Sequence, residues 1–272
     1  MIPPKVLIIA GSDSGGGAGI QADIKAVTMM GGHAMTAIAA LTAQNTLGVE
    51  AVLPVPTDMV LKQIEVVLAD LGADAVKIGM IGSPETAEAV AERLAGLGVP
   101  VVFDPVMVAS SGAQLADEAT IAAFRKLMAV ATLITPNAPE LAALTGSDVA
   151  SLEEAEDAAL SLAREYGIAV LAKGGHIAGA AVADTLVEKD GRVTRWESPR
   201  IETLSTHGTG CTLASAIAAG VGQGRALADA TSRAREYVHA AIAAAPGFGS
   251  GHGPIGHTLG TIPFALIHKS AG

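Results

Sequence analysis

The sequence has little cysteine, few aromatic side chains and few charges. Its single cysteine among 272 residues excludes an internal disulfide and is typical of proteins in a reducing compartment. Aromatic residues make up 3% and charged residues 16% of the chain, whereas 50% of it is hydrophobic. Because alanine and glycine are abundant, we expect a core in which helices and strands approach closely through small side chains.

Basic charge and long apolar runs are also missing. The net charge of -10 argues against a general nucleic-acid binder, which normally presents a basic face. No run approaches the roughly 18–20 apolar residues of a membrane helix, and the run 6–10 is too short for a signal peptide. The sequence therefore predicts a cytoplasmic protein with neither a nucleic-acid nor a membrane partner.

What the sequence does have is a regular alternation of short apolar runs and amphipathic segments. The apolar runs predict strands over 6–10, 33–41, 51–55, 75–78, 99–103, 132–134 and 168–172. Two further runs, 181–187 and 192–197, flank Asp190-Gly191, which is typical of a β-hairpin. Helical spacing predicts helices over 18–30, 57–71, from 84 onwards, and over 117–130, 137–144, 152–166, 209–221 and 226–244.

This alternation indicates an α/β fold with a mostly parallel central sheet, helices on both faces and a small hairpin at one edge. No repeat, linker or shift in composition divides the chain, so we expect a single domain over 1–272. Thr57 and Ser83 stand where helix N-caps are expected. Ligands of such sheets bind beyond the carboxyl ends of the strands, so the loops after strands are the candidates for chemistry.

The glycine-rich loop over 11–19 follows the first strand. It lacks the Gly-Lys-Ser/Thr ending of a Walker loop. It does fit a loose dinucleotide fingerprint, but the acidic residue expected about 20 positions later is missing. A tight turn that feeds a helix explains the glycines equally well.

The segment 206–212 precedes an alanine-rich helix and contains His207-Gly208-Thr209-Gly210-Cys211. Its small residues leave the first-turn N–H groups unobstructed at the positive end of the helix dipole. This predicts an anion cradle suited to a phosphoryl group. The helix start is also expected to lower the pKa of Cys211, although a buried small hydrophobe is the commoner fate of a lone cysteine.

Polar residues follow three other predicted strands. Asp104 ends the run 99–103, where a carboxylate suits magnesium or caps a turn. Asn137 with Glu140 offers oxygen ligands, or else a helix N-cap completed as a capping box. Lys173 follows the run 168–172 and could place an ammonium on a phosphate. His252 lies in a glycine-rich loop without the spacing of a zinc site, so structural zinc is not expected.

An ordered set of motifs spans nearly the whole chain. In chain order they are IAGSDSGGGAGIQADIKA, AALTAQNT, KIGM, DPVMVASSG, LITPNAPELAALTG, AKGGH, STHGTGCTLASAIAAG and GHGPIGH. Together they resemble the hydroxymethylpyrimidine/phosphomethylpyrimidine kinases of thiamine biosynthesis, which belong to the ribokinase-like superfamily. The resemblance implies a ribokinase-like three-layer sandwich and a homodimer. It also implies that ATP, with Mg²⁺, phosphorylates 4-amino-5-hydroxymethyl-2-methylpyrimidine and then its monophosphate to the pyrophosphate.

The resemblance also implies roles for individual residues. Gly208, Thr209 and Gly210 would form the anion hole, and Cys211 would assist deprotonation of the substrate hydroxymethyl group. The pyrimidine pocket would contain Gly11, Asp23, Gln44, Met80, Val106 and Met107. Asp104, Asn137 and Glu140 would organise magnesium and the ATP phosphates, with Asp104 and Glu140 as metal ligands, and Lys173 would lie against the phosphates. Ser110 departs from the family pattern, which has lysine there.

Three other functions stay open. A pyridoxal kinase of the same superfamily acts on a similar small ring but stops after one phosphorylation. A non-catalytic nucleotide-binding or regulatory homologue would keep the fold without ATP turnover. A dinucleotide-dependent oxidoreductase is disfavoured by the missing acidic residue.

Overall fold

The structure is a computed structural model that describes residues 2–109 and 112–258; Ser110 lies outside the described residues. Its strands form a nine-stranded sheet in the order β3-β2-β1-β4-β5-β6-β7-β8-β9. The strands are β1 (Lys5–Asp13), β2 (His33–Gln44), β3 (Val49–Pro54), β4 (Ala75–Ile78), β5 (Val101–Phe103), β6 (Leu133–Ile134), β7 (Ala169–Ala172), β8 (Ala181–Val187) and β9 (Val193–Pro199).

The centre of the sheet is parallel and both of its edges are antiparallel. Strands β2, β1, β4, β5, β6 and β7 pair in parallel. The predicted hairpin, β8 with β9, continues the sheet antiparallel to β7. β3 closes the opposite edge, also antiparallel. The expected α/β sheet with an edge hairpin is confirmed, and the second antiparallel edge is an addition.

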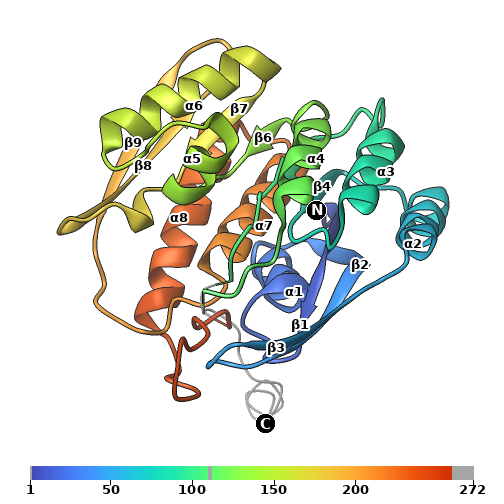
Figure 1. The fold of residues 1–272 in the computed structure, drawn as a ribbon, viewed down its shortest axis with the longest axis horizontal. Coiled ribbons are helices and arrows are strands. Elements are labelled where there is room, and N and C mark those ends of the chain that lie inside the picture. Colours follow the sequence, from blue (N-terminus) through green and yellow to red (C-terminus); the bar gives the residue numbers. More distant parts are fainter. Residues whose placement is uncertain (1, 110–111, 259–272) are drawn as a thin grey trace, which may run out of the picture.

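Helices cover both faces of the sheet (Figure 1). They are α1 (Gly19–Met29), α2 (Thr57–Asp70), α3 (Pro84–Leu94), α4 (Glu118–Met128), α5 (Ala138–Thr145), α6 (Leu152–Tyr166), α7 (Thr209–Gly222) and α8 (Leu227–Ala243), with the short 3₁₀ helix η1 (Gly174–His176) after β7. Alternate residues of β1 face opposite layers, as expected for a strand buried on both sides. Val6 and Ile8 pack in the cluster with α1, α7 and α8. Leu7 and Ile9 pack in the cluster with α2 to α6.

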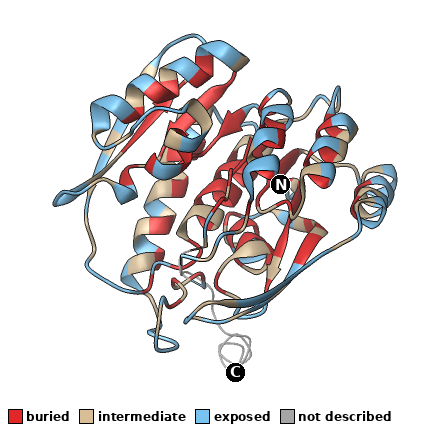
Figure 2. Cartoon of the chain, viewed as in Figure 1, coloured by how far each residue is buried: buried red, intermediate tan, exposed pale blue. Residues whose placement is uncertain are grey.

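Small side chains let two of these helices approach closely. A Cβ atom on Gly220 of α7 would lie 2.8 Å from the Cβ of Ala230 in α8, so glycine is required at this crossing. α7 buries Ala214, Ala216 and Ala218, and Figure 2 shows it largely buried behind the neighbouring layers. The expected alanine- and glycine-rich packing is therefore present in this layer.

Four of the eight α-helices in the described residues, α3 to α6, begin with a side-chain cap. The Ser83 side chain accepts from the Thr86 amide at the start of α3. Asn137 and Glu140 form a reciprocal capping box at α5. The predicted cap at Thr57 is wrong, because Pro56 is the N-cap and Thr57 begins the helix. The Thr57 hydroxyl instead lies 2.8 Å from that of Thr86 and ties α2 to α3.

The strand order reverses beside β1. From β1 the chain moves to β2 on one side and later returns to β4 on the other. Such a switch point leaves a crevice at the carboxyl ends of the two strands, where ligands of open α/β sheets bind. The loops after β1 and β4 begin at this crevice. Among the described residues, no helix is both long enough and apolar enough to cross a membrane.

Candidate active site

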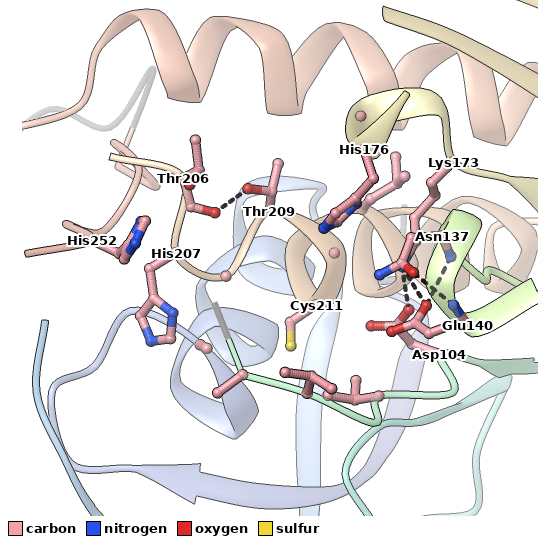
Figure 3. Close-up of a pocket in the computed structure, with 18 of the residues that line it drawn as sticks. Asp104, Asn137, Glu140, Lys173, His176, Thr206, His207, Thr209, Cys211 and His252 are labelled. Carbon is pink, nitrogen blue, oxygen red and sulfur yellow. Dashed lines mark hydrogen bonds and ion pairs between the residues drawn. The ribbon is translucent and has the colours of Figure 1, made fainter. Parts of the chain in front are cut away.

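A cavity of about 890 Å³ lies over the carboxyl ends of the parallel strands. With one exception, every residue assigned to the site from sequence lines it. These residues are Gly11, Gln44, Met80, Asp104, Val106, Met107, Asn137, Glu140, Lys173, Gly208, Thr209, Gly210 and Cys211. Figure 3 shows Cys211 between two groups of polar residues, His207 on one side and Asp104 with Lys173 on the other. We call these the glutamine end (Asp13, Gln44 and His207) and the lysine end (Asp104, Glu140, Lys173 and Gly210).

The start of α7 is pressed against the first glycine-rich loop. Gly208, the N-cap of α7, has φ +84°, and a Cβ atom there would lie 1.8 Å from the Gly17 carbonyl oxygen. Only glycine fits this position. The two glycine-rich segments, which are far apart in the sequence, thus form one wall of the cavity. The side chain of Thr209 donates to the Thr206 carbonyl oxygen and closes the turn before the helix (Figure 3).

Gly210 leaves room at the lysine end. A Cβ atom on Gly210 would lie 3.2 Å from Lys173 Nζ and 3.5 Å from Asp104 Oδ2. The positive end of the α7 dipole, an ammonium and a carboxylate therefore converge on one point. The first-turn amides of a helix bind anions, and this convergence places a cation and a carboxylate beside them.

The lysine end is a compact cluster of compensated charges. Lys173 Nζ lies 2.8 Å from Asp104 Oδ1 and 3.7 Å from Glu140 Oε2. Burial opposes the charge of Asp104, but the ammonium groups of Lys173 and Lys77 outweigh it and hold the Asp104 pKa below its ordinary value. Burial lowers the Lys173 pKa, yet the carboxylates of Asp104 and Glu140 outweigh burial and raise it. Asp104 also accepts from the Thr135 hydroxyl at 2.8 Å.

Glu140 has a structural role that the sequence had left as an alternative. Its Oε2 accepts from the Asn137 backbone at 2.8 Å, while the Asn137 side chain accepts from the Glu140 amide at 2.9 Å. Burial raises the Glu140 pKa to about 7. The carboxyl group is thus held at the start of α5 and still reaches the Lys173 ammonium.

The donor chemistry of the lysine end fits magnesium. Asp104 and Glu140 contribute hard carboxylate oxygens to the same cation, Lys173. Among the described residues, no group of three or more His, Cys, Asp and Glu side chains could hold a metal ion. Magnesium usually takes one or two carboxylates and completes its shell with phosphates and water, so two carboxylates suffice.

Cys211 lies at the start of α7, but its pKa is not lowered there. Burial raises the pKa of the thiol to about 11, although the Lys77 ammonium opposes this. The prediction of a lowered pKa is therefore wrong, because loss of water outweighs the helix end. Without ligands, the thiol is protonated at neutral pH.

Asp23 is the exception among the predicted site residues, and its expected contact with a ring is corrected. It is 0% exposed and lies beneath the cavity, where both carboxylate oxygens are 2.9 Å from Lys77 Nζ. The Ser215 hydroxyl of α7 donates to the same carboxylate at 2.7 Å. Lys77 itself lines the cavity and was missed from the sequence. Its one signal was a charged residue inside the apolar run 75–78, and its partner lies 54 positions away.

The glutamine end is held by hydrogen bonds. Asp13 accepts backbone hydrogen bonds from the following turn and meets His207 Nε2 at 2.9 Å. Gln44 lies 3.2 Å from the same nitrogen. In the lining of the same cavity, a Cβ atom on Gly11 would lie 3.0 Å from the sulfur of Met80, so glycine lets this thioether approach the first strand. Asp13 and His207 line the cavity and were also missed, because they are 194 positions apart in sequence.

Comparison with known proteins decides the family. A family model described as phosphomethylpyrimidine kinase matches residues 13–256. The chain belongs to this family. The match contains every residue of the lysine end and the glutamine end.

Individual relatives agree with the family match. The chain is 46% identical over 260 residues to the hydroxymethylpyrimidine/phosphomethylpyrimidine kinase of Streptomyces coelicolor, covering 94% of each protein. It is also 46% identical to the thiamine biosynthesis bifunctional protein of Geobacter sulfurreducens, but spans only 52% of that longer protein. The similarity therefore concerns about half of that relative's length.

Two solved structures show the same ribokinase-like architecture. The phosphomethylpyrimidine kinase of Clostridium difficile is 37% identical with a TM-score of 0.77, covering 88% of this chain and 99% of that one. The pyridoxal kinase of Bacillus subtilis, solved as an ADP complex, is 32% identical with a TM-score of 0.86, covering 94% and 98%. The sequence identity is higher to the pyrimidine kinase, whereas the TM-score is higher to the pyridoxal kinase. The residues of the site must therefore distinguish the two activities.

Proposed function

We propose that this chain transfers the γ-phosphoryl group of ATP to the hydroxymethyl oxygen of 4-amino-5-hydroxymethyl-2-methylpyrimidine, and then to the resulting monophosphate. The observation that carries the proposal is the convergence at Gly210 of the α7 start, Lys173 and Asp104. Phosphoryl transfer needs positioning and stabilisation of charge on the equatorial oxygens, with little covalent chemistry from the protein. The lysine end offers both the positioning and the stabilisation of charge.

The backbone amides and the charged side chains of the site have different roles in the transfer. The backbone N–H groups of Gly208, Thr209 and Gly210 and the Lys173 ammonium stabilise the negative charge that builds on the transferring group. Asp104 and Glu140 would hold magnesium, and Asn137 would orient the phosphates. When bound, magnesium neutralises charge on the ATP phosphates. Because contacts with Gly17 and Thr206 hold the start of α7 in place, these interactions need little reorganisation.

Cys211 is proposed to accept the hydroxyl proton. The thiol lines the cavity between its two ends. With a pKa of about 11, it must ionise before it can accept a proton, and the Lys77 ammonium favours the thiolate. Transfer therefore speeds up as pH rises toward the pKa of the thiol.

The ring binds at the other end of the cavity. Gln44 supplies hydrogen bonds, and Gly11, Met80, Val106 and Met107 supply an apolar surface. Asp23 acts only indirectly, as the counter-charge of Lys77. A homodimer and a cytoplasmic location, expected from the sequence, stay predictions.

Phosphorus NMR of a reaction with the pyrimidine and Mg·ATP tests the proposal. The expected spectra show a monophosphate that appears first and is then consumed as the diphosphate forms. Accumulation of the monophosphate alone would indicate single-step chemistry of the pyridoxal kinase kind. Absence of both products, with intact folded protein, would contradict the proposed function.

A further inference from the structure

The side-chain amide of Gln44 lies between two polar groups at the glutamine end. Its Nε2 is 3.2 Å from His207 Nε2, and its Oε1 is 3.2 Å from Thr42 Oγ1. Rotation by 180° about the last side-chain bond exchanges the two amide atoms with almost no change in shape. The hydrogen-bonding needs of the two neighbours therefore decide which orientation is stable.

His207 must be a donor at Nε2. This nitrogen lies 2.9 Å from Asp13 Oδ2, and the same carboxylate accepts from the amides of Gly15, Gly17 and Ala18. Burial opposes ionisation of Asp13, but hydrogen bonds from His207 and the backbone outweigh it and lower its pKa. An ionised carboxylate only accepts, so the hydrogen between the two groups belongs to His207. A donating Nε2 cannot also accept from the nitrogen of an amide.

Thr42 imposes the matching requirement on the other amide atom. Its hydroxyl oxygen is 2.9 Å from the carbonyl oxygen of Ser12, which can only accept. The single hydroxyl hydrogen therefore points at Ser12, and Thr42 Oγ1 has only lone pairs to offer Gln44. The amide atom facing Thr42 should be the nitrogen.

We propose that Asp13, His207 and Thr42 are positioning residues that turn the Gln44 amide so that Oε1 faces His207 and Nε2 faces Thr42. In this orientation, each hydrogen that points at a neighbour within the network meets an acceptor, whereas the reverse orientation opposes two donors at His207. Two donors that face each other at a partly buried site leave both without an acceptor, which disfavours the reverse orientation. The amide keeps one lone pair on Oε1 and one hydrogen on Nε2 for a ligand.

The fixed amide selects one edge of a ring, and this step rests on the proposed function. A 4-aminopyrimidine presents an amino donor beside the acceptor N3, which pairs with Oε1 and Nε2 respectively. The 4-oxo analogue presents an acceptor beside an N3–H donor, the reverse pattern. It could bind only if the amide turned back against His207 and Thr42.

Ratios of kcat/KM for the 4-amino substrate and its 4-oxo analogue test the inference. The wild type should prefer the amino ring by roughly 10³-fold or more, as expected of a site built around donor and acceptor positions. His207→Leu should reduce this ratio at least about tenfold, because the amide is then free to turn. His207→Gln, which keeps a donor, should stay within about threefold of the wild-type ratio. His252→Leu, at another histidine lining the cavity, should keep it as well.

A structural role for His207 predicts a different result. If His207→Leu lowers kcat/KM for both rings equally, the ratio stays constant and the inference is overturned. Because His207 is buried, thermal unfolding of each variant is measured first. If His207→Leu does not fold, Thr42→Val replaces it, with Thr42→Ser as the matched control. Valine should lower the ratio several-fold and serine should preserve it, and an unchanged ratio in the valine variant overturns the inference.

The position of the proton on His207 gives a test that needs no substrate. Nitrogen NMR of the ligand-free protein should find a hydrogen on Nε2. If the wild type fails to phosphorylate the aminopyrimidine, the proposed function fails and this spectrum alone decides the orientation. A hydrogen on Nε2 then supports it, and a bare Nε2 overturns it.

Discussion

The two ends of the cavity hold their polar groups by different means. The lysine end balances charge against charge, with Lys173 between the carboxylates of Asp104 and Glu140. At the glutamine end, His207 donates to the Asp13 carboxylate, and the neutral Gln44 amide lies against the same ring nitrogen. Charged groups stabilise a phosphoryl group during its transfer whatever the substrate is. Hydrogen-bond donors and acceptors in fixed positions instead distinguish one ring from another. We therefore expect changes at the lysine end to lower turnover and changes at the glutamine end to alter substrate choice.

Loss of the Lys173 ammonium should have the largest effect. Lys173→Met should lower kcat roughly 10³-fold, since a donor to the developing charge disappears. Steady-state kinetics measure kcat, and calorimetry measures the affinity for the pyrimidine. This affinity should change by less than about threefold. Lys62→Met, at an exposed pair with Glu65, is the matched control and should leave both unchanged. A selective loss of pyrimidine affinity would place Lys173 at the wrong end of the cavity.

Removal of the Cys211 thiol should change both rate and pH dependence. Cys211→Ala should lower kcat about 10²-fold, the lower end of the range for a positioned base. With a pKa of about 11, the thiolate fraction rises tenfold per pH unit below that value. The wild-type kcat should therefore rise from pH 7 to 9, and the variant profile should be flat. A flat wild-type profile would remove Cys211 from the role of base.

A single methyl group at Gly210 should hinder transfer without disturbing the fold. Gly210→Ala places a Cβ atom 3.2 Å from Lys173 Nζ, and kcat should fall about 10–100-fold as the phosphoryl position is crowded. Gly222→Ala, at the other end of α7, has its nearest neighbours at 3.4 Å and serves as the control. Equal losses in the two variants would indicate a general effect on the helix.

Loss of the Gln44 amide should have the smallest effect on turnover. Gln44→Leu should raise KM for the pyrimidine about tenfold, with kcat within about threefold, because a hydrogen-bonded ring contact is lost before chemistry begins. Initial rates over a range of pyrimidine concentrations measure both constants. A large fall in kcat at unchanged KM would show that the two ends do not divide their work in this way.

The sequence predicted the fold well because its signals are local. Apolar runs, the Asn137–Glu140 capping box and the Asp190-Gly191 hairpin turn each lie within a few residues, and each is present in the structure. The placement of site residues after strands also followed from the parallel sheet. The exposed edge strand β3 is antiparallel, and no pattern in its own sequence indicated that direction.

The sequence predicted less about interactions between distant segments. Lys77 pairs with Asp23 across 54 positions, so a buried ion pair below the cavity replaced the expected ring contact. Burial raised the Cys211 pKa, and burial depends on every element packed around the start of α7. Asp13 and His207 meet only because the two glycine-rich segments are in contact, which no local pattern reveals.

A competition assay tests the central claim most directly. The wild-type protein is given equal concentrations of the hydroxymethylpyrimidine and pyridoxal with Mg·ATP, and all phosphorylated products are quantified over time. A site with a charged end for transfer and a fixed amide for the ring should convert the pyrimidine through its monophosphate to the diphosphate, with little pyridoxal phosphate formed. Pyridoxal phosphate as the main product, with the pyrimidine untouched, would contradict the account.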